Sequence, residues 1–414
     1  MIEQPSRTHQ QEADTARLKE RERHKLLAQR TEQLRALWRA DNVLGHAHAR
    51  LGMKTRKWDS HPWLLGTKQG VIDLRTGILR AGQPDDHVRA LIPTAWKGLD
   101  EPAPRFMQFL REIFGDRAEA EREELIAFLQ RALGYGITGN VKENVFLMLY
   151  SEEGCNEKDM LMHTLEYVLG KAVGAVSSDV LMSTTPETTK SHLSSLQGKR
   201  IAWASESSRE PRFAIEQIKQ LTSGGEIVAR QLYTREYAFS PSHLLILLTN
   251  YRPEADAADS VFWERLCPLV FNVRFVEKPK RANERLRDPQ LSVALEAEAS
   301  GILAWLVRGA LEWTRLGLAI PKSVRKVRQE YRCSESSVPD FVDQCCVLVA
   351  EARTPANLLY KHYKRWASDN DLTPVNNKQF ARELKQVVGV SYKKRAASGN
   401  MYAGIRLCVE HEAE

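Results

Sequence analysis

The sequence predicts an α/β fold built on a mainly parallel sheet, and two observations support that prediction. Three short apolar runs, at residues 145–150, 200–206 and 244–249, are separated by helical stretches, and each ends in a polar residue. A small polar loop with a lysine follows the first run and precedes an amphipathic helix, which is the order found in a phosphate-binding loop. We therefore expect a binding site at the carboxyl ends of the strands.

Length and composition indicate a soluble protein of two or three domains, since the 414 residues are 43% hydrophobic. No run approaches the roughly 18 apolar residues of a membrane span, and the first 36 residues lack the apolar segment of a signal peptide. We expect a cytoplasmic protein without a membrane partner. The six cysteines are scattered without a Cys-x-x-Cys pair, which favours free thiols.

The chain can be divided by its local patterns. Residues 1–36 mix eight basic and six acidic side chains, as in a solvated helix or a disordered arm. Turn signals between residues 63 and 99 predict a small hairpin-containing region, and helical spacing follows over 103–134. The basic segment 278–281 is interpreted as a linker. The expected divisions are an arm (1–50), an N-terminal α+β region (51–135), a core (136–280), a helical linker (281–318) and a C-terminal domain (319–410).

The C-terminal domain is expected to be mostly helical. Its periodicity predicts helices near 322–332, 336–350, 356–368 and 376–388, followed by a hairpin that turns at 398–400. From Arg353 to Arg406 there are eleven Lys or Arg residues against three Asp or Glu, a surplus of eight that exceeds the net charge of +7 of the whole chain. This region is the electrostatic candidate for binding a polyanion, with a solvated helical face as the alternative.

The loop at residues 151–160 departs from a phosphate loop as much as it matches one. Gly154, Asn156 and Lys158 fit, but Glu157 replaces the glycine before the lysine and Asp159 takes the hydroxyl position. Met160 stands where Thr would be usual. A side chain at positive φ costs about 1 to 2 kcal/mol. A carboxylate roughly 5 Å from a phosphate adds about 3 kcal/mol of repulsion. Together these would weaken binding about a thousandfold or more.

Three further residues could complete a nucleotide site. Glu206 ends the second apolar run and suits a carboxylate that holds magnesium or polarises water, although a lone acid there could also be a surface residue. Asn250 ends the third run and could orient that water or simply form a turn. Arg265 could act as an arginine finger on the phosphate of a neighbouring subunit, or form an ordinary ion pair.

The order of these motifs resembles a known family. The segments 198–206, 218–226 with Ala229-Arg230, 247–250 with Pro253, and 262–266 are similar to the superfamily 3 helicase domain of phage and plasmid primase-helicases. Residues 70–77 look like the domain that precedes the helicase in that family, and 320–407 resembles its C-terminal winged-helix region.

The resemblance implies an AAA+-like P-loop NTPase core that binds ATP and Mg2+ and assembles as a homo-hexamer on single-stranded DNA. On that basis Lys158 contacts the β and γ phosphates, Glu206 is the Walker B acid, Asn250 is the sensor and Arg265 is the finger acting in trans. Gly154, Asn156, Lys158 and Asp159 are the candidate nucleotide-binding residues. Asp159 and Glu206 are the candidate magnesium ligands.

Two segments are the candidates for DNA contact. Lys219 and the segment 224–230 correspond to an additional family motif, with a neighbouring hairpin that offers Arg230, Arg235, Tyr233 and Tyr237 to single-stranded DNA. An ordinary β-hairpin with exposed arginines is the alternative. In the C-terminal domain, a winged helix-turn-helix on duplex DNA would use basic residues of its recognition helix and wing, or would make protein contacts instead. Those residues are Lys378, Arg382, Lys385, Lys393, Lys394 and Arg395.

The sequence therefore predicts an ATP-dependent DNA helicase for the replication of a phage, prophage or plasmid. The alternative is a catalytically impaired homologue that serves as a DNA-binding and oligomerisation protein, because Glu157 and Met160 are unfavourable in the loop. Priming activity is not predicted, since the recognisable part begins near residue 60.

Overall fold

The computed structural model divides the chain into two compact units, Met1–Trp58 and Asp59–Glu414. The structure describes residues 7–35 and 58–408, except for 184–190, 207–211, 231–235, 258, 371, 373, 386, 388–389 and 394–399. The first unit contains α1 (Arg7–Arg35), whose described side chains are exposed. Of the two forms expected for the N-terminal arm, the solvated helix is the one observed.

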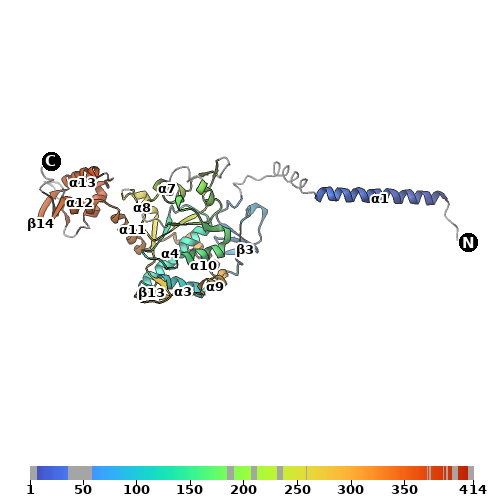
Figure 1. Ribbon diagram of the computed structural model, residues 1–414, viewed down its shortest axis with the longest axis horizontal. Helices are drawn as coiled ribbons and strands as arrows, with labels where there is room; N and C mark the ends of the chain where they lie inside the picture. Colours follow the sequence, from blue (N-terminus) through green and yellow to red (C-terminus); the bar gives the residue numbers. More distant parts are fainter. Residues whose placement is uncertain are drawn as a thin grey trace. The chain divides into compact units, whose positions relative to one another are not determined.

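A five-stranded parallel sheet forms the centre of the second unit (Figure 1). Its strands in spatial order are β11 (Leu266–Val270), β5 (Phe146–Tyr150), β10 (Leu244–Thr249), β7 (Ile201–Glu206) and β6 (Val173–Ala175). The prediction of a parallel sheet from the three apolar runs is confirmed, and β6 and β11 add a strand at each edge. Both edge strands are shorter or interrupted by proline, so their apolar signal is weaker.

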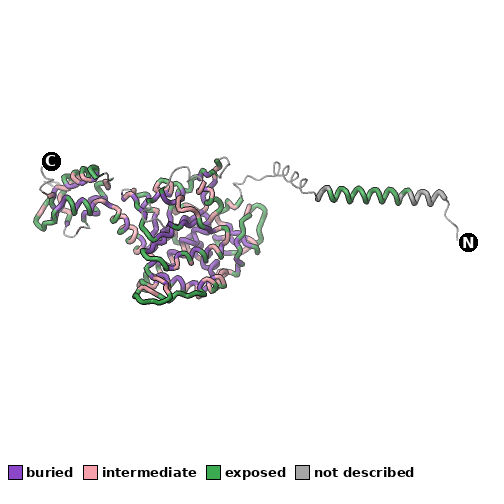
Figure 2. The backbone as a smooth tube through the Cα atoms, viewed as in Figure 1, coloured by how far each residue is buried: buried purple, intermediate pink, exposed green. Residues whose placement is uncertain are grey.

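Both faces of the sheet are covered, which explains why its strands are apolar throughout. Along β5, Leu147 and Leu149 join one hydrophobic cluster, whereas Phe146, Met148 and Tyr150 join the other. Successive side chains point to opposite faces. Figure 2 shows these central strands as buried.

The two clusters are formed with largely different helices, and α11 (Lys322–Ser334) contributes Val324 to the first cluster and Tyr331 to the second. The first is formed with α3 (Pro104–Ile113), α4 (Glu119–Thr138), α5 (Lys158–Leu169), α9 (Leu291–Ala297) and α10 (Ala299–Leu316). The second is formed with α7 (Ile215–Thr222), α8 (Ser260–Arg265) and α11. Short 3-10 turns η2 to η5 occupy Pro84–Asp86, Gly170–Ala172, Ser178–Val180 and Ser194–Leu196.

Helices α4 and α10 approach each other closely because glycines stand at their contact. A Cβ atom on Gly134 would lie 2.2 Å from the backbone nitrogen of Ala310, and one on Gly309 would lie 2.1 Å from the carbonyl oxygen of Gln130. Any larger residue would force the two backbones apart. The segment predicted as a helical linker thus includes a helix packed directly against the core.

A small four-stranded sheet precedes the core, as the turn signals predicted. Its order is β3 (Ile78–Arg80), β2 (Gly70–Asp73), β1 (Leu64–Thr67) and β4 (Leu91–Ile92). Arg200, buried at the start of β7, ties this sheet to the core. Its Nη2 donates to the carbonyl oxygen of Leu64 at 3.3 Å, and its Nη1 donates to that of Thr138 at the end of α4.

The C-terminal region of this unit, residues 338–407, contributes every fully buried member of a third hydrophobic cluster except Ala257. Its elements in chain order are α12 (Val338–Cys345), β14 (Cys346–Pro355), α13 (Ala356–Asp369), α14 (Asn377–Leu384), β15 (Ser391–Lys393) and β16 (Met401–Leu407). The three strands pair antiparallel in the order β14-β16-β15. The predicted helix over 336–350 is wrong in its second half, where β14 begins. The predicted turn at 398–400 falls mostly outside the described residues.

Two short strand pairs lie beside the core: β8 (Ile227–Ala229) with β9 (Tyr237–Phe239), and β12 (Arg274–Val276) with β13 (Glu284–Leu286). Across the described part of the chain, no helix is long and apolar enough to cross a membrane.

Candidate functional site

The phosphate-type loop lies between β5 and α5, at the carboxyl edge of the parallel sheet. Glu157, the residue before the helix, has φ of 60° and ψ of 19°, and Cys155 has φ of 62°. The left-handed backbone that a glycine would adopt freely is therefore present, and a glutamate occupies it. Glu157 makes no side-chain cap on α5, which leaves the first-turn N–H groups of this helix facing the loop.

The loop is folded on one of its own carbonyl groups. The Ser151 hydroxyl donates to the carbonyl oxygen of Glu153 at 2.5 Å, and the Asn156 amide donates to the same atom at 2.6 Å. Both donors belong to buried residues, whereas Gly154 is exposed. Ser151 and Asn156 thus hold the shape of the loop, a role that sequence reasoning recognised for neither residue.

Lys158 and Asn250 are brought together by the pairing of β5 with β10. The Lys158 ammonium donates to the Asn250 side-chain oxygen at 2.7 Å and to the Thr249 carbonyl oxygen at 3.0 Å. Lys158 is 4% exposed. Burial lowers the pKa of its amine to about 8, and the neighbouring Asp159 partly opposes that shift. A cation is therefore held at the amino end of α5, beside the polar end of β10.

Glu206 ends β7, the strand on the other side of β10, and it pairs in register with Thr249. Glu206 is buried, and Asn250 is exposed. Asp159, in the first turn of α5, is exposed to solvent. Lys158, Asn250 and Glu206 thus all lie at one edge of the sheet, as the sequence predicted for the ends of its apolar runs.

The donor set at this edge suits magnesium together with phosphate. Among the described residues, no group of three or more His, Cys, Asp or Glu side chains is placed to hold a metal ion. In nucleotide sites Mg2+ typically takes one or two carboxylates and completes its shell with phosphate oxygens and water. Glu206 and Asp159 offer oxygen ligands of that kind, so they fit a partial ligand set.

Arginines from the segment after β11 neutralise the acidic loop. Arg274 Nε lies 2.9 Å from one Glu153 carboxylate oxygen, and Arg281 Nη1 lies 3.1 Å from the other. The Phe275 backbone N–H donates to the carbonyl oxygen of Cys155 at 2.6 Å. The pKa of Glu157 is raised, chiefly by burial, and Arg287 opposes that shift. The segment interpreted as a linker is thus part of the site.

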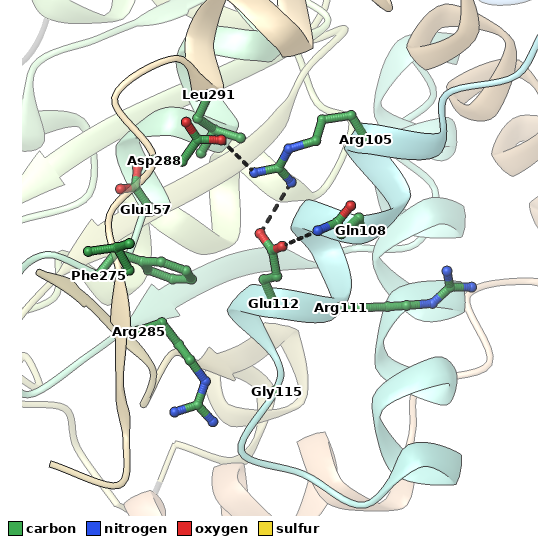
Figure 3. A pocket seen from close by; sticks show the side chains of 11 residues that line it. Arg105, Gln108, Arg111, Glu112, Gly115, Glu157, Phe275, Arg285, Asp288 and Leu291 are labelled. Carbon is green, nitrogen blue, oxygen red and sulfur yellow. Dashed lines mark hydrogen bonds and ion pairs between the residues drawn. The ribbon is translucent and has the colours of Figure 1, made fainter. Parts of the chain in front are cut away.

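A cavity of about 620 Å3 opens beside Glu157, between α3 and the β12–β13 pair (Figure 3). Arg105 spans it, with one nitrogen 3.2 Å from Glu112 and another 3.1 Å from Asp288. Phe275, Leu286 and Leu291 provide apolar lining. A second cavity of about 500 Å3 shares three residues with the first and reaches Met160 in α5; the shared residues are Glu157, Leu286 and Asp288. No sequence motif pointed to either cavity.

Two segments of the chain match described protein families. Residues 6–115 match the family described as "D5 N terminal like", and residues 335–405 match "Poxvirus D5 protein-like". In the sequence, the first segment precedes the strands of the parallel sheet and the second follows them.

In these two segments the chain is similar to D5-like proteins.

Curated proteins similar to this chain come from viruses. It is 27% identical over 361 residues to the candidate helicase L207/L206 of Acanthamoeba polyphaga mimivirus, covering 82% of this chain and 37% of that protein. It is 22% identical to the candidate primase C962R of African swine fever virus, covering 79% of this chain and 35% of that protein. It is 20% identical to the candidate helicase 121R of invertebrate iridescent virus 3, covering 83% of this chain and 39% of that protein. The chain thus spans between 35% and 39% of the length of these relatives.

Among solved structures, the chain is similar to apo structures of the NrS-1 C-terminal region. One of them, the A form, is 11% identical, covers 84% of this chain and 83% of that chain, and gives a TM-score of 0.44. Another is 12% identical with the same coverage and a TM-score of 0.40.

The predicted arginine finger, Arg265, makes its hydrogen bonds within its own chain. Its Nη1 donates to the Lys219 carbonyl oxygen at 3.1 Å and to the Thr222 hydroxyl at 2.5 Å. The Lys219 ammonium pairs with Asp259, which caps α8, and with Glu216 at 3.0 Å. These contacts raise the pKa of Lys219, most through the Asp259 hydrogen bond. Lys219 and Arg265 are thus neighbours, and both join α7 to α8.

The remaining basic candidates fall in two places. Arg230 is exposed next to β8, while Tyr233 and Arg235 lie outside the described residues. In the C-terminal domain Lys378, Arg382 and Lys385 are exposed, the first two on α14 and the third at its end. Lys393 ends β15, and Lys394 and Arg395 lie outside the described residues. The predicted basic face is therefore present on a helix shorter than expected.

Proposed function

We propose that this chain is an ATP-dependent DNA helicase that acts in the replication of a virus, phage, prophage or plasmid. The observation that carries the proposal is the placement of the buried Lys158 ammonium beside Asn250, at the amino end of α5. A helix N-terminus with a fixed cation is suited to phosphate. The similarity to D5-like proteins and to viral helicases favours nucleotide-driven work on DNA over other phosphate chemistry.

Each residue of this edge has a role in the proposed reaction. Lys158 contacts the β and γ phosphates, and Asn250, which accepts its hydrogen bond in the free chain, senses the γ phosphate and orients the attacking water. Glu206 polarises that water. Mg2+, held by Glu206 and Asp159 with the phosphates, would neutralise charge developing on the leaving group. Gly154 and Asn156 shape the loop around the phosphates.

The cavity beside Glu157 has room for the nucleoside part of ATP. It begins at the residue that precedes Lys158, so a nucleotide with its phosphates at α5 could reach it. Phe275, Leu286 and Leu291 offer apolar contact to a base, and the carboxylates of Glu112 and Asp288 offer acceptors. The cavity therefore supports a nucleotide as the ligand, rather than inorganic phosphate.

We also propose that residues 338–407 form a winged helix-turn-helix that binds duplex DNA. The order of helices and strands, α12-β14-α13-α14-β15-β16, supports that assignment. On it, α14 is the recognition helix with Lys378, Arg382 and Lys385, and Lys393, Lys394 and Arg395 belong to the wing. Lys219 on α7, Arg230 next to β8, and Arg235 would contact single-stranded DNA.

Assembly as a homo-hexameric ring with Arg265 acting in trans is a further part of the proposal. In the single chain the Arg265 Nη1 donates hydrogen bonds to Lys219 and Thr222 of α7. The other guanidinium nitrogens of Arg265 would therefore have to reach the phosphate of a neighbouring subunit. Multi-angle light scattering with Mg-ATP and single-stranded DNA tests the ring. A mass that stays at one chain under those conditions would contradict it.

The test of the function is ATP hydrolysis with and without single-stranded DNA. We expect hydrolysis that rises with DNA and falls to background in Lys158→Ala and Glu206→Gln variants. Activity no higher than that of Lys158→Ala would rule out the enzyme. It would favour the second candidate, a DNA-binding and assembly protein, for which the left-handed Glu157 and the missing hydroxyl at Asp159 argue.

A further inference from the structure

The phosphate-type loop carries an unusual charge for its proposed ligand. Residues 151–159 include four carboxylates and one lysine. A nucleoside triphosphate would bring several more negative charges to the same place. The loop also lacks the hydroxyl of a phosphate loop at Asp159. Cations from outside the loop are therefore needed if a triphosphate is to bind.

Arg274, in β12, and Arg281, in the segment between β12 and β13, supply such cations. Arg274, at the start of β12, lies 2.9 Å from Glu153 and 3.0 Å from Glu284, and its Nε also points to the Gly154 carbonyl oxygen at 3.4 Å. Arg281 lies 3.1 Å from the other Glu153 oxygen. The hydrogen bond from Phe275 N–H to Cys155 fixes β12 against the loop, so Arg274 is held in place by backbone as well as by charge.

The two arginines differ in their surroundings. The Arg274 side chain is 23% exposed, whereas that of Arg281 is 62% exposed. Ion pairs screened by water contribute little, so the pair with Arg281 holds Glu153 weakly. A guanidinium group matches phosphate oxygens with two parallel hydrogen bonds, as it matches a carboxylate. A phosphate can therefore replace Glu153 on both arginines without any change in the type of contact.

We propose that Arg274 and Arg281 form a subsite for the terminal phosphates of a nucleoside triphosphate, and that the Glu153 carboxylate occupies this subsite until the triphosphate displaces it. The inference rests on the proposed nucleotide function and adds two phosphate ligands to it. It assigns to segment 274–281 the positive charge that offsets the excess of carboxylates in the loop. Glu153 then acts as a tethered competitor of the ligand.

An alternative role for the same contacts is a purely structural clamp on the loop. The two roles predict opposite results for Glu153. If the pairs only hold the loop, removing the carboxylate charge weakens ATP binding as much as removing the arginine does. If Glu153 competes with phosphate, removing its charge leaves the two arginines paired with Glu284 alone and strengthens ATP binding.

The experiment is a calorimetric titration of the full chain with ATP and with AMP, each in Mg2+. Arg274→Gln is expected to weaken ATP binding by about tenfold or more, with AMP binding within about twofold of the natural chain. Glu153→Gln is expected to strengthen ATP binding by about threefold or more, a gain that misfolding cannot produce. Lys278→Gln and Glu152→Gln, matched charge removals in the same two segments, are the controls.

Three outcomes would overturn the inference. If Glu153→Gln weakens ATP binding by the same factor as Arg274→Gln, the contacts are a clamp. If Arg274→Gln binds ATP like the natural chain while Lys158→Ala does not bind, the subsite is wrong and the proposed function stands. If neither the natural chain nor Glu153→Gln binds ATP in a Lys158-dependent manner, both the subsite and the proposed function fail.

Discussion

Lys158 is the residue on which the proposed nucleotide site depends, and its charge is sensitive to its surroundings. Burial lowers the pKa of its amine to about 8, while the hydrogen bonds to Asn250 and Thr249 keep the group at the end of α5. The folded chain therefore binds this proton less tightly than the unfolded chain does. Stability contributed by this group rises with pH between about 8 and the ordinary lysine value, because the cost of burying the cation disappears there.

The same pKa predicts how nucleotide binding depends on pH. A triphosphate binds the charged amine, so ATP affinity should be nearly constant below pH 8 and fall about tenfold per unit above it. Titrations at pH 7, 8 and 9 measure this. In Lys158→Arg, which keeps its charge across that range, the fall should disappear. An unchanged affinity of the natural chain from pH 7 to 9 would show that Lys158 does not contact the phosphates.

The left-handed backbone of Glu157 leads to a second prediction, which concerns the thermal stability of the chain. Its φ of 60° costs a non-glycine residue about 1 kcal/mol or more, which Glu157→Gly would remove. We expect this variant to unfold at the same or a higher temperature and to bind ATP more tightly. Glu152→Gly is the matched control, because Glu152 has no left-handed backbone and should lose stability on becoming glycine. Equal losses in both variants would contradict the strain at Glu157.

At the scale of elements, the contact between α4 and α10 supports the sheet that carries the site. Gly134 and Gly309 allow the helices to approach, and α4 ends at Gly139 with a φ of 73°. The β12–β13 pair similarly supports the loop, through Phe275 and Arg274. Both features join segments more than 100 residues apart in the sequence.

Close packing of α4 and α10 predicts a large effect from one methyl group. Gly134→Ala places a Cβ within 2.2 Å of backbone atoms of α10, so we expect a decrease of about 2 to 4 kcal/mol in the free energy of unfolding. Urea denaturation measures it. Gly225→Ala has open space around its new Cβ and should change stability by less than about 1 kcal/mol. A small effect at Gly134 would mean that the helices can separate freely.

The exposed face of α14 predicts DNA affinity that depends on salt. Replacing Lys378, Arg382 and Lys385 with Gln should weaken duplex binding and reduce the slope of log affinity against log salt by about 1 for each phosphate that is no longer neutralised. Fluorescence anisotropy over a salt series measures both. The matched control replaces three exposed cations of α13: Lys361, Lys364 and Arg365. Equal effects of the two triple variants would indicate general charge attraction rather than recognition by α14.

At the scale of the whole molecule, local patterns predicted the architecture well where apolar periodicity was strong. The strands at 146–150, 201–206 and 244–249, and the meeting of Lys158, Asn250 and Glu206 at their ends, follow from that signal. The first half of strand β14 was mistaken for helix, because the ten residues of this strand are mostly exposed and carry no alternating burial. The contacts of Arg274 and Arg281 with the loop were missed because their partner Glu153 is distant in sequence. A basic segment can be recognised as part of this site only from its tertiary contacts.

The central claim is that Lys158 anchors a nucleoside triphosphate at the amino end of α5. Equilibrium titration of Mg-ATP into the full chain and into Lys158→Ala, with thermal unfolding to verify that both fold, tests it most directly. We predict saturable binding to the natural chain and an affinity lower by about tenfold or more in the variant, as expected when a charged group no longer binds the phosphates. Equal affinities in the two proteins, or no binding to either, would contradict the claim.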